Sequence, residues 1–185
     1  MTPEILKDAE QRMAKAVEAA QHDFSTIRTG RANPVLLERV AVDYYGTQMH
    51  INQLATVTAP EPRLLIVAPW DKGAISVIEK AIQNSDLGIT PSSDGNVIRL
   101  QIPYLTEERR KEMIKILHRK AEDGKIAVRN IRRDANEHLK DLEKKHEISE
   151  DENKRTQEQV QKLTDKYIEQ IDKLQAAKEQ ELMEV

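Results

Sequence analysis

The strongest constraint on the fold is a long run of regularly spaced apolar residues in the second half of the chain. Between Met113 and Leu142 these residues recur at steps of four or three. The positions are Met113, Leu117, Ala121, Gly124, Val128, Ile131, Ala135, Leu139 and Leu142. Such spacing puts a continuous stripe on one side of an α-helix. The sequence therefore predicts one amphipathic helix from about Thr106 to Ile148, about 60 Å long.

The opposite side of this predicted helix is mostly cationic. Its positions are Lys111, Lys115, His118, Glu122, Lys125, Arg129, Arg132 and Asn136. From Arg109 to Arg133 there are ten Lys/Arg and three Asp/Glu, a net charge of +7, whereas the whole chain has a formal charge of −3. The positive charge is therefore local, which indicates an oriented contact and argues against indiscriminate binding of polyanions.

Two further apolar stripes predict two more helices. Met1–Arg28 forms the first, with Thr2 as N-cap and Pro3 at the first helical position. Its stripe is Leu6, Ala9, Met13, Val17, Ala20, Phe24 and Ile27. The last helix opens at Ser149–Glu152, which has the pattern of a capping box. Its stripe is Val160, Leu163, Tyr167, Ile171, Leu174 and Leu182. Three such stripes predict a three-helix bundle.

The segment between the first two helices has a different pattern. Short β-branched runs alternate with turn signals and predict strands. The expected strands are Val35–Tyr44, Thr47–Ile51, Ala55–Ala59, Arg63–Pro69 and Val97–Ile102. One helix is expected between Asp71, its cap, and Asn84, and a turn at Ser93–Asn96. This is a small β/α/β module inserted into the bundle.

The predicted fold class is therefore α+β: an elongated antiparallel three-helix bundle with an inserted small β/α/β domain. We expect residues 1–29 and 106–185 to form the bundle and residues 30–105 the insert. Two short adjacent connections favour a hinge and a bent, L-shaped molecule. The hinge residues are Thr29, Gly30, Asn33, Pro34, Pro103, Tyr104, Leu105 and Thr106. Gly30 is expected to cap the first helix in the left-handed conformation.

Composition argues against catalysis. The chain has no cysteine, its five histidines form no close pair, and its six glycines form no phosphate-cradling pattern. We therefore expect no catalytic residue, metal or cofactor. No apolar run approaches the length of a membrane span, and we expect a cytoplasmic protein with no membrane partner.

Three segments together resemble the ribosome recycling factor family: Thr26–Pro34, Leu105–Arg110 and Arg129–Asn136. The resemblance covers essentially the whole chain. It implies a hinged L and a factor that binds the ribosome after termination, on large-subunit ribosomal RNA at the subunit interface. It further implies that elongation factor G and GTP hydrolysis on that partner help to split the ribosome into subunits, and that the smaller domain meets this partner.

The cationic stripe has two interpretations. It could be a solvated face balanced by pairs along the helix. Because Arg129, Arg132 and Arg133 cluster with one adjacent carboxylate, Asp134, we favour contact with RNA phosphates, to which Lys125 also contributes. The absence of aromatic residues on this face favours recognition of backbone shape over base stacking.

Two arginines beside the first connection are also candidates. Arg28 could complement the dipole at the helix end or contact RNA, and both interpretations stay open. For Arg31, beyond the helix end, we favour RNA.

Two other functions compete with ribosome binding. A coiled-coil scaffold would use the stripes to bind other helices, but three stripes can satisfy one another within one chain, so we expect a monomer. A small enzyme built on the β module lacks any convergent acid, base or nucleophile set.

Overall fold

The computed structural model describes residues 1–184, so Val185, the last residue of the predicted bundle domain, lies outside the description. The chain divides into two compact units. Met1–Ile27 and Lys111–Glu184 form the first, here called the helical unit. Arg28–Arg110 forms the second, here called the small unit. Each is described by itself.

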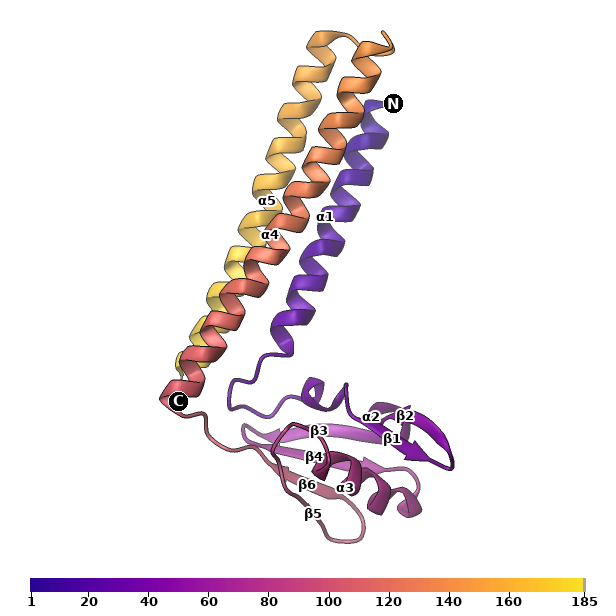
Figure 1. Ribbon diagram of the computed structural model, residues 1–185, viewed down its shortest axis with the longest axis vertical. Helices are drawn as coiled ribbons and strands as arrows, with labels where there is room; N and C mark the ends of the chain where they lie inside the picture. The colour runs from indigo at the N-terminus through magenta and orange to yellow at the C-terminus, as the bar shows by residue number, and fades with distance from the viewer. Residues whose placement is uncertain (185) are drawn as a thin grey trace. The chain divides into compact units, whose positions relative to one another are not determined.

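The helical unit is a bundle of long helices, as predicted. Its helices are α1 (Thr2–Ser25), α4 (Glu107–Lys144) and α5 (Glu150–Met183). They lie side by side along their lengths, with α4 antiparallel to both α1 and α5 (Figure 1). The α+β fold class, a helical bundle with a small sheet-containing unit, is confirmed.

The buried faces follow the predicted stripes closely. On α4 every predicted apolar position is buried except Gly124, which is half-buried. On α1 the buried residue in the first turn is Ile5, and Leu6 is half-exposed, so the predicted start of that stripe was wrong by one position. The remaining stripe of α1, from Ala9 to Ile27, is buried as predicted.

Gly124 lies where three helices approach closely. A Cβ atom at this position would be 3.2 Å from the Cβ of Ala20 and 3.4 Å from Cδ1 of Ile171. The first distance is tighter than ordinary packing and the second is at the short end of van der Waals contact, so the glycine permits the close approach of α1 to α4 and leaves room for Ile171 of α5. This explains a residue that costs about 1 kcal/mol of helix propensity relative to alanine.

The ends of α1 differ from the prediction. The N-cap is Met1, and the Thr2 hydroxyl instead donates to Glu152 Oε1 on α5 at 3.3 Å. The helix ends at Ser25 rather than Arg28, because the hydroxyls of Ser25 and Thr26 donate hydrogen bonds to the carbonyls of His22 and Asp23 in the last turn.

Helix α4 begins as predicted. Thr106 Oγ1 accepts the Arg109 N–H at 3.1 Å and caps the start of the helix.

The turn between α4 and α5 is formed by its own residues. Helix α4 ends at Lys144, four residues before the predicted Ile148. His146 adopts a left-handed φ of 57°, and the Glu147 N–H bonds the Leu142 carbonyl, which closes a Schellman turn.

The Ser149 hydroxyl oxygen caps the next helix, as predicted. It accepts the Glu152 N–H at 3.1 Å, so α5 begins at Glu150. The capping-box pattern read from the sequence therefore marks the true start of this helix.

The small unit contains a hairpin and a four-stranded antiparallel sheet ordered β3-β4-β6-β5. The strands are β1 (Ala41–Tyr44), β2 (Thr47–His50), β3 (Ala55–Glu61), β4 (Leu64–Pro69), β5 (Pro91–Ser93) and β6 (Ile98–Gln101). The helical segments are η1 (Pro34–Leu37), α2 (Ile51–Leu54), η2 (Lys72–Ala74) and α3 (Ile75–Gln83). Helix α3 packs against β1 and β5 and buries Ile78 and Ile82 in the core.

The structure of this unit differs from the prediction in three places. Residues 34–37 form a 3-10 turn, not a strand, because Asn33 Oδ1 accepts the Val35 N–H and caps it. Ile51 begins α2 rather than ending β2, and its side chain is fully buried. The short strand β5 was not predicted.

Candidate RNA-binding surface

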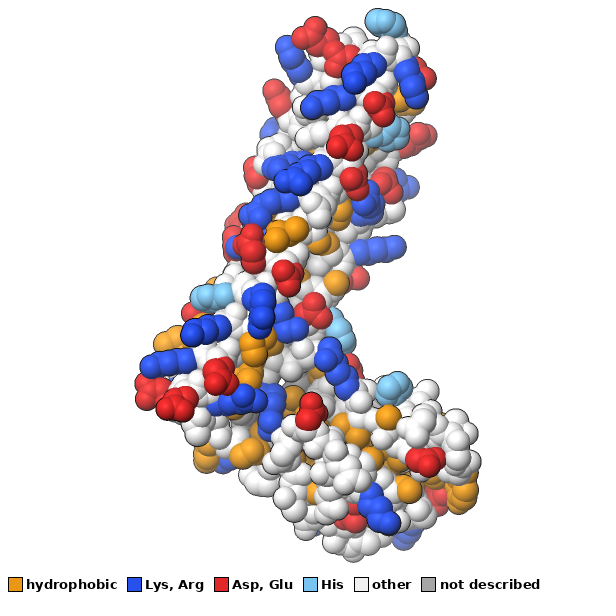
Figure 2. Space-filling model, viewed as in Figure 1, with side chains coloured by type: hydrophobic (Ala, Val, Ile, Leu, Met, Phe, Trp, Pro, Cys, Tyr) orange, Lys and Arg blue, Asp and Glu red, His pale blue; other side chains and the backbone are white. Residues whose placement is uncertain are grey.

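The cationic side chains of α4 are presented to solvent along the helical unit. Figure 2 shows Lys and Arg side chains in rows along this unit, with Asp and Glu between them. The acidic neighbours decide which cations remain uncompensated, because a charge that is already paired gains less from a phosphate.

Two members of the predicted site are paired within the helical unit. Lys125 reaches across to Asp172 of α5, and its side chain is only 19% exposed. Arg129 Nη1 bonds Glu122 Oε1 at 3.0 Å on the same helix. Asp172 is not predicted as a partner from the sequence, because an apolar stripe identifies the buried face of α5 and not the residues on either side of it. The balanced-face interpretation therefore holds for these two cations.

Arg132 has a different partner. Its Nη1 donates to the neutral amide oxygen Oε1 of Gln161 at 3.3 Å, and Gln161 Nε2 donates to Asp165 Oδ1 at 2.8 Å. The amide orients the guanidinium without cancelling its charge. The remaining donors of the planar fork stay available for a bidentate contact with phosphate oxygens.

Arg133 is exposed, and the described residues offer it no ion-pair partner. The adjacent carboxylate, Asp134, is held by Arg12 of α1 at 2.9 Å, and Arg12 also lies 3.9 Å from Asp8. Arg12 therefore competes for the one carboxylate beside Arg133. Of the four α4 residues predicted to bind RNA, Arg132 and Arg133 are therefore the two without a carboxylate partner among the described residues.

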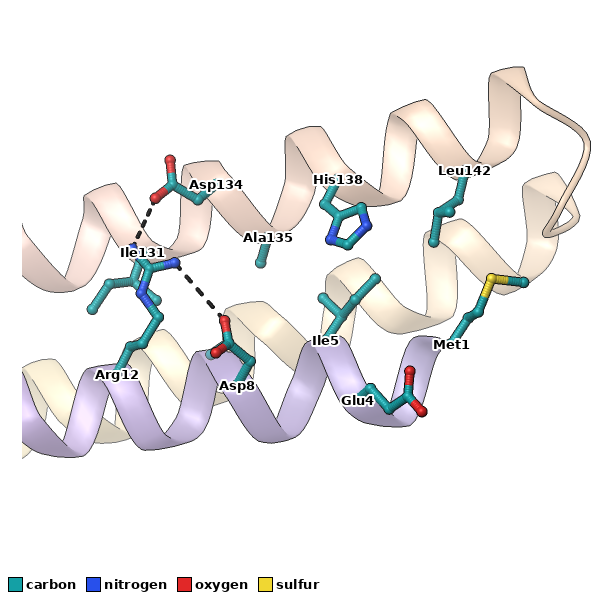
Figure 3. Close-up of a pocket in the computed structure, with 11 residues that line it drawn as sticks. Met1, Glu4, Ile5, Asp8, Arg12, Ile131, Asp134, Ala135, His138 and Leu142 are labelled. Carbon is teal, nitrogen blue, oxygen red and sulfur yellow. Dashed lines mark hydrogen bonds and ion pairs between the residues drawn. The ribbon is translucent and has the colours of Figure 1, made fainter.

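A groove runs between α1 and α4 (Figure 3). Its volume is about 370 Å³, and its lining combines apolar residues such as Ile5 and Leu142 with Asp8 and His138. The Arg12–Asp134 and Arg12–Asp8 pairs close one end of it. Its mixed lining contrasts with the cationic face of α4.

Arg28 and Arg31 belong to the small unit and behave differently. Arg28 is partly buried and donates from Nη1 to the Leu87 carbonyl at 2.8 Å. Burial, reinforced by the neighbouring charge of Arg109, lowers the pKa of the guanidinium. Arg28 thus holds the loop at Leu87, a role absent from both sequence interpretations. Arg31 is exposed, and its N–H donates to the Thr29 hydroxyl at 3.3 Å.

Hydrogen bonds within the small unit hold part of the predicted hinge in place. Ala32 N–H bonds the Pro62 carbonyl at 2.6 Å, and Asn33 caps η1. Gly30 has φ +80° but lies beyond the helix end, so it does not cap α1 as predicted. A Cβ atom on Gly30 would contact Leu105 at 3.6 Å.

Arg63 anchors the returning connection. Its guanidinium lies 3.1 Å from the centroid of the Tyr104 ring and donates to the Ile102 carbonyl at 2.7 Å. The residues that follow Tyr104 before α4 are Leu105 and Thr106. A cation–π contact of this kind stabilises the connection up to Tyr104.

Within residues 1–184, no group of three metal-ligating side chains converges. The same described residues contain no helix long and apolar enough to cross a membrane. Asp71 and Asp94, the acidic residues that could suggest chemistry, accept backbone N–H bonds from Gly73 and from Asn96 and Val97. These hydrogen bonds make both carboxylates turn and cap residues.

Comparisons of the sequence and of the structure with known proteins indicate the same family. Residues 20–183 match the family described as Ribosome recycling factor. The ribosome-recycling factor of Carboxydothermus hydrogenoformans is 60% identical over 185 residues, which is 100% of both chains. A solution structure of the ribosome recycling factor has a TM-score of 0.76 and 46% identity, covering 100% of this chain and 98% of that chain.

A second similar structure belongs to a set of models for the T. thermophilus ribosome recycling factor and the E. coli elongation factor G bound to the E. coli post-termination complex. It has a TM-score of 0.69 and 47% identity and covers 98% of each chain. The family match spans most of the sequence, and both the helical and the small unit are shared with these structures. This chain therefore belongs to the ribosome recycling factor family.

Proposed function

We propose that this chain binds the post-termination ribosome on large-subunit ribosomal RNA at the subunit interface. With elongation factor G and GTP it promotes dissociation into subunits, which can then be reused for translation. The family consists of translation factors that are not enzymes. The related factor that was placed with elongation factor G on a post-termination complex supports the choice of partner.

The uncompensated charge at Arg132 and Arg133 carries the RNA-binding part of the proposal. Arg132 is oriented by a neutral amide, and the carboxylate next to Arg133 is engaged by Arg12. Guanidinium groups of this kind match phosphate oxygens in charge and geometry. Arg129 and Lys125 contribute at the edge of the contact. On binding, each leaves its carboxylate partner on the helical unit and pairs with a phosphate group of the RNA.

Arg31 supplies a second RNA contact at the connection between the units. Arg28 supports this contact indirectly, because its guanidinium holds the Leu87 loop. The contact surface is thus narrower than the six basic residues predicted from sequence: Arg132 and Arg133 form its centre.

In the proposed mechanism, movement of the small unit relative to the bound bundle separates the subunits. The glycines of the chain form no phosphate-cradling loop, so the free energy for splitting comes from GTP hydrolysis on the partner. The bundle stays bound through α4, while the small unit moves about the connections at residues 29–34 and 103–106. The anchored positions, Asn33 and Tyr104, mark where each connection joins the small unit.

We place the factor in the cytoplasm, where its ribosomal substrate is assembled and used, and infer that it acts as a monomer. Most residues of the three predicted stripes are buried within one chain, and Leu6, Leu163 and Leu174 are partly exposed. Within residues 1–184 the bundle therefore presents only these few stripe residues to a second copy. Light scattering that gives a concentration-independent mass of 21.2 kDa supports the monomer.

A splitting assay tests the function as a whole. Post-termination ribosomes are mixed with the chain, elongation factor G and GTP, and light scattering follows dissociation. We expect a fall in scattering that needs all three additions and is absent with a non-hydrolysable GTP analogue. Splitting that proceeds equally without the chain contradicts the proposal.

A further inference from the structure

Three consecutive charged residues of α4 point in three different directions. Each residue of an α-helix is rotated by about 100° from the one before it. Ile131 and Ala135 are buried and mark the side of α4 that faces the bundle core. Arg133 therefore points away from the core, with Arg132 on one flank and Asp134 on the other. Two cations and one carboxylate thus share the solvent-facing arc of the helix.

The two flanking side chains are held by different helices. On one flank, Arg132 Nη1 donates to Gln161 Oε1 of α5 at 3.3 Å. On the other flank, Arg12 Nη2 of α1 donates to Asp134 Oδ2 at 2.9 Å. The first partner is a neutral amide, whereas the second is a cation that opposes a negative charge. The charge that each flank presents to solvent is therefore set by a neighbouring helix as well as by α4.

Arg12 is engaged with carboxylates and is itself a poor contact for RNA. Its Nη2 bonds Asp134, and its Nη1 lies 3.9 Å from Oδ2 of Asp8, four residues earlier on α1. Figure 3 shows the guanidinium between these two carboxylates at one end of the groove between α1 and α4. A phosphate group that approached Arg12 would therefore meet two negative charges beside the single positive one.

Without Arg12, the carboxylate of Asp134 would be an unopposed negative charge beside the phosphate-binding arginines. Asp134 follows Arg133 in the sequence, and its side chain is 57% exposed, so burial does not remove its charge. The Cα atoms of neighbouring residues are about 3.8 Å apart, well within the Debye length of about 8 Å at physiological ionic strength. Repulsion between Asp134 and a phosphate group at Arg133 would therefore be incompletely screened.

We propose that Arg12 is a positioning residue of the RNA-binding surface: it holds and neutralises Asp134 so that phosphate groups can bind Arg132 and Arg133. This inference rests on the proposed function and adds to it a residue of α1 that does not itself contact RNA. The phosphate-binding surface of α4 is then complete only when α1 packs beside it, because α4 alone would present an unopposed carboxylate next to Arg133.

A purely structural role for Arg12 gives a different expectation. The Arg12–Asp134 pair also joins α1 to α4, and Arg12→Ala removes this link. Exposed ion pairs contribute little to stability, so the bundle of this variant stays folded. If the link itself were needed for binding, a second substitution at Asp134 could not restore it. Recovery of binding after removal of the Asp134 carboxylate therefore distinguishes neutralisation of a charge from the joining of two helices.

Three variants of the full chain separate these roles. Arg12→Ala leaves Asp134 without its partner, and Arg12→Ala with Asp134→Asn removes the carboxylate as well. Arg12→Ala with Asp8→Asn is the matched control, because it restores the same net charge by neutralising the other carboxylate beside the arginine. Arg132→Ala and Arg133→Ala are the references for loss of a direct contact. Binding of each variant to isolated large ribosomal subunits is measured at one near-physiological ionic strength.

We expect Arg12→Ala to bind about fivefold more weakly than the parent, the effect of one unopposed charge beside the contact at a partly screened surface. The double variant with Asp134→Asn should bind within about twofold of the parent, because the repelling carboxylate is gone. The double variant with Asp8→Asn should remain about fivefold weaker, because Asp134 is still unopposed. Thermal melts followed by circular dichroism should show that all three variants are folded.

Three results overturn the inference while leaving the proposed RNA contact intact. In the first, Arg12→Ala binds as the parent does although Arg132→Ala binds weakly. In the second, both double variants bind as weakly as Arg12→Ala, which makes Arg12 a structural link or a direct contact. In the third, both double variants recover equally, so that net charge alone accounts for binding. Parental binding by both Arg132→Ala and Arg133→Ala contradicts the RNA contact itself, and the inference falls with it.

Discussion

The close contact at Gly124 can be tested by moving one methyl group from α1 to α4. In Gly124→Ala the new Cβ would lie 3.2 Å from the Cβ of Ala20, which is fixed to the backbone of α1 and cannot rotate away. The substitution gains about 1 kcal/mol of helix propensity. It also overpacks the seam, which costs about 1–3 kcal/mol. We expect a net loss of about 1 kcal/mol in the free energy of unfolding.

The reverse change on the facing helix should also destabilise. Ala20→Gly loses about 1 kcal/mol of helix propensity and about 0.8 kcal/mol from one buried methyl group, roughly 2 kcal/mol in all. The double variant Ala20→Gly with Gly124→Ala keeps one alanine and one glycine, and its new methyl group fills the vacated space. We expect its stability to lie within about 0.5 kcal/mol of the parent.

Urea unfolding followed by helix ellipticity at 222 nm measures all four corners of this cycle. Independent effects would make the double variant about 3 kcal/mol less stable than the parent. A double variant that shows this additive loss refutes the reasoning, because it means that positions 20 and 124 do not compete for the same space.

Three further predictions concern hydrogen bonds. The bond to Asp71 raises the pKa of Tyr44 to about 12, so Asp71→Asn should return it toward the ordinary tyrosine value, as a titration of the Tyr44 ring carbon by NMR will show. The same bond lowers the pKa of Asp71, so its stabilising contribution is present above the ordinary aspartate range and is lost as pH falls through the lowered value. In a Tyr44→Phe variant the acid limb of a thermal-melt series should therefore shift upward in pH. Ser149→Ala should cost about 1 kcal/mol of unfolding free energy, because the Glu152 N–H loses its cap, and an undiminished melting temperature would contradict this.

Periodicity predicted the bundle well because the spacing of apolar residues largely determines which face of a long helix is buried. The α4 stripe from Met113 to Leu142 is the clearest case, since a helix this long averages out local irregularities. The first turn of α1 shows the limit. Ile5 and Leu6 are equally apolar neighbours, and only the packing of the folded chain selects Ile5.

The small unit was harder to predict because short segments depend on tertiary contacts. The apolar residues at 35–37 resemble a strand, but the Asn33 side chain caps a 3-10 turn there. The three-residue strand β5 exists through its pairing with β6, a contact that no local pattern announces. Its first residue, Pro91, is also a poor strand signal.

The candidate site shows the same division. The basic face of α4 follows from the sequence, but the partners that decide which cations are free come from other helices. Asp172 and Gln161 lie on α5, and Arg12 lies on α1. Spacing along one helix cannot reveal these pairs.

The proposed binding of the bundle to RNA depends on Arg132 and Arg133. Its most direct test is binding to isolated large ribosomal subunits over a salt series for Arg132→Ala, Arg133→Ala and the control Arg155→Ala, an exposed arginine on α5 with the same charge change. The first two variants should bind more weakly, with a salt slope shallower by about one, at an unchanged melting temperature. The control should bind as the parent does. Parental affinity for both Arg132→Ala and Arg133→Ala at every salt concentration would contradict the account.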